Sequence, residues 1–281
     1  MATSTVTLTA GMRQNLFSLQ GTNNMINKTA SRLATGKKVQ TALDDPINFF
    51  AALGHQNRAT DLAQRKDQMG EAIQMVKSAN NGIEAIQDLI ASAKSLANSA
   101  KAIDACSVVT AQNAKDRSDL AVQFDNVLTQ IKELSDDAGY KGINFLNGTS
   151  VTQKVEFDEN GDSSLTITGF DGSATGLAVT SSETDWIADS DIDVAITELD
   201  AGRATLRVEA QKLTTSLSTI TTRQDFTTKM INTLEDGATA LTNADMNEES
   251  ANMLMLQTRQ ALGTSSLSMA SQAAQSVLRL F

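Results

Sequence analysis

The chain has 281 residues, a formal net charge of −10, 41% apolar residues and only 4% aromatic residues. Such an acidic chain lacks the clustered lysine and arginine that neutralise phosphates, which excludes a typical nucleic-acid-binding protein. Its single cysteine, Cys106, excludes an internal disulfide. No run reaches the roughly 18 apolar residues of a membrane span, and the first twenty residues do not resemble a cleaved signal. We therefore expect no nucleic-acid or membrane partner.

The charge is distributed unevenly along the chain. Residues 1–43 carry five basic and no acidic side chains, and residues 253–281 carry two arginines and no acid. All 33 acidic residues therefore lie between these two ends. Helical ends with so little charge are expected to be buried against another surface, which favours a chain that assembles with copies of itself.

The first two predicted helices have apolar residues at steps of three and four, so each has one apolar seam. The seam of the first includes Leu16, Leu19, Ile26 and Leu33. Gly36 is its expected C-cap, and Asp45 before Pro46 predicts the start of the next helix. Because no further proline follows, the second helix is predicted to continue to about Lys101. Its seam includes Ile73, Val76, Ile83 and Ile90.

A shorter helix is predicted from about Asn113 to Asp137. The next segment, from Tyr140 to Thr184, is rich in Gly, Thr, Ser and Asp. Apolar residues alternate with polar ones on both sides of Asn160-Gly161, a dipeptide typical of tight turns. This segment is predicted to form one or two exposed β-hairpins.

Helical periodicity returns after Trp186 and lasts for about fifty residues. This seam includes Leu206, Leu213, Leu217 and Ile220. A polar break is predicted from Asn243 to Ser250, followed by a last helix that runs from Met253 to the end of the chain. The last seam includes Leu267, Ala270, Ala274, Val277 and Phe281.

The order of these elements predicts a mainly α fold. We expect an elongated antiparallel helical bundle or coiled coil with a small β-hairpin region and paired N- and C-terminal helices. The first and last seams would pair in an inner core formed by residues 1–43 and 247–281. The second and fourth helices would pair in a shaft formed by residues 44–149 and 185–246, with a variable hairpin region at 150–184.

Four segments of the chain resemble bacterial flagellin, the subunit of the flagellar filament. The segment SRLATGKKVQTALDD (Ser31 to Asp45) is similar to the family's Arg-Leu-Ser-(Ser/Thr)-Gly element and the Asp-Asp that precedes a long helix. The helical segments that begin at Gln68 and at Arg117 resemble the first two helices of the family's core domain. The last 39 residues resemble its C-terminal signature, including Gln-Ala-X-Gln-X-Val-Leu at 272–278.

The resemblance implies a structural subunit, not an enzyme, that polymerises into the extracellular filament for swimming motility and needs no cofactor. It also implies export through the flagellar type III apparatus with a dedicated chaperone, and contact with the filament cap and hook-associated proteins. Two alternatives are a hook–filament junction protein, which shares the terminal helices, and a cytoplasmic helical-hairpin signalling module.

Other motifs have simpler interpretations than catalysis or metal binding. His55 is the single histidine, so neither a metal-binding pair of histidines nor a catalytic triad is indicated. Asp158, Asn160 and Asp162 resemble the start of a calcium loop, but Ser163 stands where such a loop needs glycine, and a hairpin turn is favoured. The Ser/Thr clusters at 149–150 and 180–184 are either solvated loops or sites for O-linked sugars.

Overall fold

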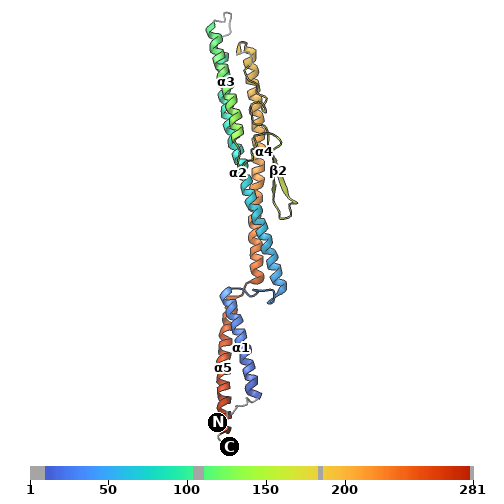
Figure 1. The fold of residues 1–281 in the computed structure, drawn as a ribbon, viewed down its shortest axis with the longest axis vertical. Helices are drawn as coiled ribbons and strands as arrows, with labels where there is room; N and C mark the ends of the chain where they lie inside the picture. The colour runs from blue at the N-terminus through green and yellow to red at the C-terminus, as the bar shows by residue number, and fades with distance from the viewer. Residues whose placement is uncertain (1–9, 104–110, 183–185, 279–281) are drawn as a thin grey trace, which may run out of the picture. The chain divides into compact units, whose positions relative to one another are not determined.

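The computed structural model describes residues 10–103, 111–182 and 186–278 (Figure 1). Within these ranges the chain is mainly helical, as predicted. The elements, in chain order, are α1 (Ala10–Thr35), α2 (Pro46–Ala102), α3 (Ala111–Asp137), β1 (Thr152–Glu156), β2 (Ser164–Thr168), α4 (Asp189–Thr242) and α5 (Met246–Leu278). Cys106 lies outside the described residues. None of the described helices is both long enough and apolar enough to cross a membrane.

The chain divides into two compact units. The terminal unit consists of Met1–Asn57 and Thr233–Phe281, and the central unit consists of Arg58–Asn232. The limits of these units fall inside α2 and α4, whereas the sequence analysis placed the limits of the inner core near residues 43 and 247. The predicted functional division into core, shaft and hairpin region therefore stays a prediction.

In the terminal unit, α1 and α5 pack side by side in opposite directions (Figure 1). Arg32 contacts Glu249, Asn23 contacts Gln260, and Leu19 lies against Gly263, so residue numbers rise along one helix as they fall along the other. A Cβ atom at Gly263 would lie 2.6 Å from Leu19 Cδ2. The absence of a side chain at 263 therefore permits this close approach.

In the central unit, α2 and α4 are also antiparallel. Lys94 pairs with Asp200 at 2.6 Å, and Lys101 pairs with Asp193. The eight predicted shaft residues belong to one apolar core, where Leu217 is partly buried and the other seven are buried. These seven are Ile73, Val76, Ile83, Ile90, Leu206, Leu213 and Ile220. The alternation of small and branched residues on these faces lets the helices interlock along their length.

The third helix, α3, completes the core of the central unit. Phe124 on α3 packs against Trp186, with ring centroids 4.8 Å apart, and both side chains are fully buried. The buried Arg117 guanidinium donates to the carbonyl oxygens of Ile103 and Ile187 and pairs with Asp189 at 2.6 Å. This single cation therefore connects α3 to the end of α2 and the start of α4.

The hairpin has the predicted turn, but only its polar face has the predicted exposure. Strands β1 and β2 pair antiparallel, with Val155 opposite Leu165, and the turn between them contains Asn160-Gly161. Val155, Phe157 and Ile167 are buried in the core of the central unit, whereas Thr152, Lys154 and Thr166 are exposed, so the predicted exposure holds for the polar face of the hairpin and is wrong for its apolar face. The alternating pattern was correct, but the apolar face packs on the helices instead of facing water.

The polar break before α5 is shorter than predicted, because α5 begins at Met246. The Asp245 carboxylate accepts hydrogen bonds from the backbone N–H groups of Asn247 and Glu248, at 2.8 and 3.3 Å. Glu248 and Glu249 lie in the first turn, where the helix dipole favours negative charge. The polar residues that suggested a loop are therefore the cap and first turn of the helix.

Candidate assembly site on the terminal helices

The predicted core residues of α1 and α5 are incompletely buried in the single chain. Leu19, Ile26, Leu33, Leu267, Ala270 and Ala274 all have intermediate exposure. Leu16 is 39% exposed. Phe281 lies outside the described residues, as does the side chain of Val277. The seam that the sequence predicted is therefore only half covered by the pairing of α1 with α5.

Most of the large apolar side chains that are exposed belong to the terminal unit. They include Leu16, Phe17 and Met25 on α1, and Leu254, Met255, Leu262 and Met269 on α5. A groove of about 500 Å³ on the outer face of α5 is lined by Ala251, Leu254, Met255, Thr258, Arg259 and Leu262. Exposed apolar surface of this extent is typical of an interaction surface.

A second exposed apolar stripe lies at the start of α2. It consists of Ile47, Phe50 and Leu53 on α2, together with Leu43 in the turn before this helix, and the four follow one another at steps of three and four. Leu43 is 97% exposed and Ile47 is 81% exposed. This stripe was not predicted, although the spacing of Ile47, Phe50 and Leu53 just after the Asp-Asp-Pro cap was visible in the sequence.

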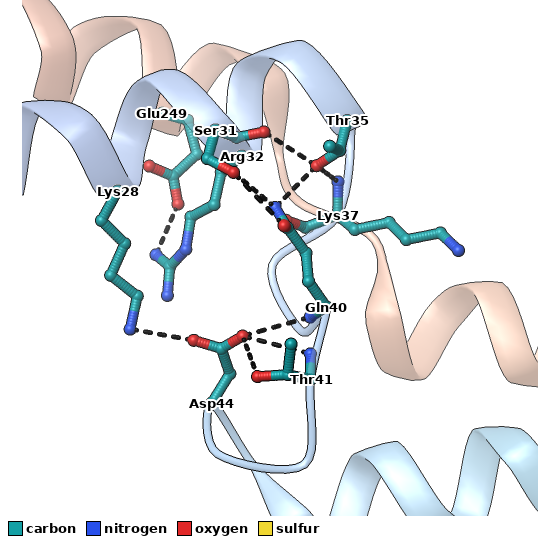
Figure 2. Close-up of polar contacts among 9 residues, drawn as sticks. All are labelled: Lys28, Ser31, Arg32, Thr35, Lys37, Gln40, Thr41, Asp44 and Glu249. Carbon is teal, nitrogen blue, oxygen red and sulfur yellow. Dashed lines mark hydrogen bonds and ion pairs between the residues drawn. The ribbon is translucent and has the colours of Figure 1, made fainter.

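A polar turn joins α1 to α2 and is shown in Figure 2. Gly36 ends α1 in the left-handed region, with φ of +69°, as the predicted C-cap requires. The amide nitrogen of the Gln40 side chain donates to the hydroxyls of Thr35 (2.8 Å) and Ser31 (3.2 Å). Lys38 N donates to the carbonyl oxygen of Thr242 at 2.7 Å, which fixes the turn to the end of α4.

The two adjacent aspartates have separate structural roles in this turn. Asp45 Oδ1 accepts a hydrogen bond from Asn48 N at 3.1 Å, which confirms the predicted N-cap of α2. Asp44 pairs with Lys28 Nζ at 3.2 Å and accepts bonds from the backbone N–H groups of Gln40 and Thr41 (Figure 2). The bond from Lys28, assisted by these two N–H groups, holds the pKa of Asp44 below its usual value.

One ion pair connects the terminal helices through their buried faces. Arg32 in the last turn of α1 pairs with Glu249 in the first turn of α5, with 2.8 Å between Nη1 and Oε1 (Figure 2). The Glu249 side chain is only 8% exposed, so this pair is partly desolvated. This pair was not predicted, because Glu249 lies in the segment 243–250 that was expected to be a polar break.

The single histidine and the calcium-like sequence both have ordinary structural settings. His55 is half-buried on α2, beside Gly237 of α4. Among residues 10–103, 111–182 and 186–278, no three histidine, cysteine or acidic side chains lie close enough together to hold a metal ion. Asp158, the first residue of the calcium-like sequence, accepts a hydrogen bond from Ser163 N within the hairpin turn.

Two family models match most of the chain. The model of the bacterial flagellin N-terminal helical region matches residues 4–151, and that of the C-terminal helical region matches residues 190–281. The chain is 29% identical to flagellin FljK of Caulobacter vibrioides over 282 residues, covering 100% of both chains. It is 26% identical to a flagellin of Brucella melitensis, covering 95% of each.

A solved structure supports the fold independently. A putative flagellar hook-associated protein from Vibrio parahaemolyticus superposes with a TM-score of 0.57 at 11% identity, covering 70% of this chain and 99% of that one. At this identity the likeness concerns the fold alone. The full-length matches, by contrast, extend over both terminal helices and both units.

Proposed function

Because the chain belongs to the bacterial flagellin family, we propose how its two units act within the polymer that flagellins form. Flagellins are structural proteins, so this chain is a structural subunit that polymerises into the flagellar filament for motility, and it is not an enzyme. The filament is extracellular. The roles of individual residues and the route of export are the proposals that follow.

The terminal helices form the inner core of the filament in this proposal. Neighbouring copies cover the predicted seam of Leu16, Leu19, Ile26 and Leu33 on α1, and the predicted C-terminal seam of Leu267, Ala270, Ala274, Val277 and Phe281. The observation that carries the proposal is the concentration of exposed apolar side chains in the terminal unit. Their transfer from water into subunit contacts would supply the main driving force for polymerisation.

The central unit forms the outer shaft. Its predicted shaft residues are already buried within one chain, so this unit has a core of its own before assembly. The absence of acidic residues from both ends of the chain supports the proposed arrangement as well. When many copies converge on one axis, acidic side chains there would repel one another, whereas the acidic central unit keeps the subunit soluble.

Export and assembly require further partners. We infer that the chain leaves the cell through the flagellar type III apparatus, and that a chaperone covers the C-terminal helix beforehand. The exposed Leu254, Met255 and Leu262 on α5 support this inference, because such a surface promotes premature association. Contact with the filament cap and with hook-associated proteins would follow at the two ends of the polymer.

The two alternative functions are less well supported. A hook–filament junction protein would share the fold, but the FljK protein and the Brucella melitensis relative, which match all or nearly all of the chain, are flagellins. A cytoplasmic signalling module would not need the exposed seams on both terminal helices. The length of the polymer distinguishes a junction protein from a filament subunit. The location of the protein, inside or outside the cell, distinguishes a signalling module from a filament subunit.

Purified full-length protein, seeded with short filament fragments and examined by electron microscopy, tests the proposal. We expect long filaments that release no subunits at neutral pH. Short rings or small oligomers of fixed size would instead support a junction protein. A chain that stays monomeric under all seeding conditions, and is absent from the sheared extracellular fraction, would contradict the filament role.

A further inference from the structure

Three Asn-Gly pairs occur in the chain, at 81–82, 147–148 and 160–161. Asparagine followed by glycine is the dipeptide most open to spontaneous deamidation, because glycine has no side chain to shield its own backbone nitrogen. The three pairs have the same two residues but different surroundings. Comparing the deamidation rates of the three pairs therefore shows how the surrounding structure controls this reaction.

The reaction depends on the backbone nitrogen of the glycine. This nitrogen attacks Cγ of the asparagine, the new N–Cγ bond forms as the Cγ–Nδ2 bond breaks, and ammonia leaves with the proton of the glycine nitrogen. Water then opens the five-membered succinimide at either carbonyl, giving aspartate or isoaspartate. A glycine N–H group that is held in a hydrogen bond must first be released, which slows the attack.

The structure restrains two of the three glycine nitrogens. Gly82 is buried inside α2, so its N–H group belongs to the helical hydrogen-bond ladder. Gly148 N donates to the carbonyl oxygen of Phe170 at 3.1 Å. Gly161 N has no hydrogen-bond acceptor within the part of the chain that the structure describes.

Asn160 and Gly161 lie at the tip of the hairpin turn. Asn160 is exposed, and Gly161 has φ of +78°, a conformation that favours glycine. The turn is closed outside this pair, by the bonds from Phe157 N to Ser163 O and from Ser163 N to Asp158 Oδ1. The tip can therefore change conformation without loss of the strand pairing.

The negative charge of Glu156 opposes deamidation at Asn160, but two neighbouring cations compensate it. The Glu156 carboxylate lies 3.4 Å from the position that a Cβ atom of Gly161 would occupy, and an uncompensated anion would disfavour loss of the glycine proton. However, Glu156 pairs with Lys154 at 3.0 Å and with Arg65 at 2.9 Å. These two cations reduce the negative field at the Gly161 nitrogen.

We propose that Asn160 is a self-modification site, at which the folded chain converts asparagine to aspartate or isoaspartate with water as the only co-reactant. The product places a new carboxylate between Glu159 and Asp162 at an already acidic tip. Glu159 forms an ion pair with Arg58 at 2.5 Å, so the new charge competes for that arginine. Isoaspartate also lengthens the backbone inside the turn.

Peptide mapping by mass spectrometry tests the proposal. The purified chain is incubated at mildly alkaline pH, and deamidation at the three asparagines is followed with time in buffer and in denaturant. In buffer we expect Asn160 to react about tenfold faster than Asn147, the ratio expected if one hydrogen bond must break first. Asn81 should remain unmodified while α2 is folded.

The denatured sample and two variants are the controls. In denaturant the three rates should converge, because the dipeptide is the same. Asn160→Gln should remove most isoaspartate from the folded protein, and the matched Asn147→Gln should leave it unchanged. Equal rates at Asn147 and Asn160 in buffer, or the same ranking of sites in denaturant as in buffer, would overturn the proposal.

Discussion

The two units of the chain are both built from long helices, but they differ in how much of their apolar surface is buried. The largest fully buried side chains, among them Trp186, Phe124 and Phe145, belong to the central unit. The terminal unit buries few large side chains and exposes Phe17, Ile47 and others of the same type. The central unit therefore buries its apolar surface within one chain, whereas the terminal unit leaves apolar surface exposed, which the proposed assembly would cover.

The largest effect is expected from a charge on the seam of α5. Leu267→Asp places a carboxylate on the half-buried face that assembly would cover, where an unpaired charge is very unfavourable. We expect this variant to lose polymerisation completely, measured by sedimentation after seeding. Its circular dichroism as a monomer should stay close to that of the wild type.

A matched control for this variant is Ser266→Asp, which adds the same charge at the neighbouring, exposed position of α5. It should still polymerise. If Leu267→Asp formed normal filaments, the assignment of this seam to the filament core would be wrong. If both variants failed to polymerise, the effect would come from charge on α5 in general and not from the seam.

A smaller effect is expected in the central unit, where a substitution should lower the stability of the monomer but leave polymerisation intact. Leu206 is fully buried, so Leu206→Ala should lower the free energy of unfolding of the monomer by about 3 kcal/mol, through lost burial and a residual cavity. Denaturant titration followed by circular dichroism measures this change. Filaments should still form at a temperature where the variant remains folded.

The control for Leu206 is Val208→Ala on the same helix, where the side chain is 49% exposed. Its unfolding free energy should change by no more than about 0.5 kcal/mol. A large loss of stability at Val208, or none at Leu206, would mean that the core of the central unit is not the one described above.

The smallest effect is expected on the polar turn between α1 and α2, whose stability should depend on pH through Asp44. Because the pKa of Asp44 is lowered by Lys28 and by the N–H groups of Gln40 and Thr41, its stabilisation of the turn is complete above its unfolded-state pKa. This contribution is lost as the pH falls through the lowered, folded-state pKa. Asp44→Asn should therefore leave the turn less protected at neutral pH than in the wild type.

Hydrogen exchange at the backbone N–H groups of Gln40 and Thr41, corrected for the intrinsic dependence on pH, measures that effect. The matched variant Asp45→Asn keeps a side-chain oxygen that can cap α2, so it should protect these two groups as the wild type does. Equal protection in wild type and Asp44→Asn at neutral pH would contradict the proposed role of the Asp44 carboxylate.

Sequence patterns predicted the helices well because their signals are local. Gly36, Asp45 and Pro46 gave the end of one helix and the start of the next, since each acts through the backbone of its own neighbours. The start of α5 was misplaced because Asp245 and the two glutamates after it are equally compatible with a loop and with a capped first turn.

Contacts between distant segments could not be predicted in the same way. The pairing of Arg32 with Glu249 depends on how α1 and α5 align, and nothing in the local pattern specifies that alignment. The burial of the hairpin likewise depends on helices that lie far from it in the sequence. The seam residues, however, were recognisable from their spacing, because one apolar face is a property of each helix alone.

Three contacts between α1 and α5 fix how these two helices align, and this has a consequence for the regularity of the polymer. Each is of a different kind: an ion pair at Arg32, an amide pair at Asn23, and a close fit of Leu19 against a glycine. A slide by one helical turn, about 5.4 Å, would break all three at once. These contacts therefore hold α1 and α5 in the same alignment in every subunit. A regular polymer of many copies requires subunits of the same shape.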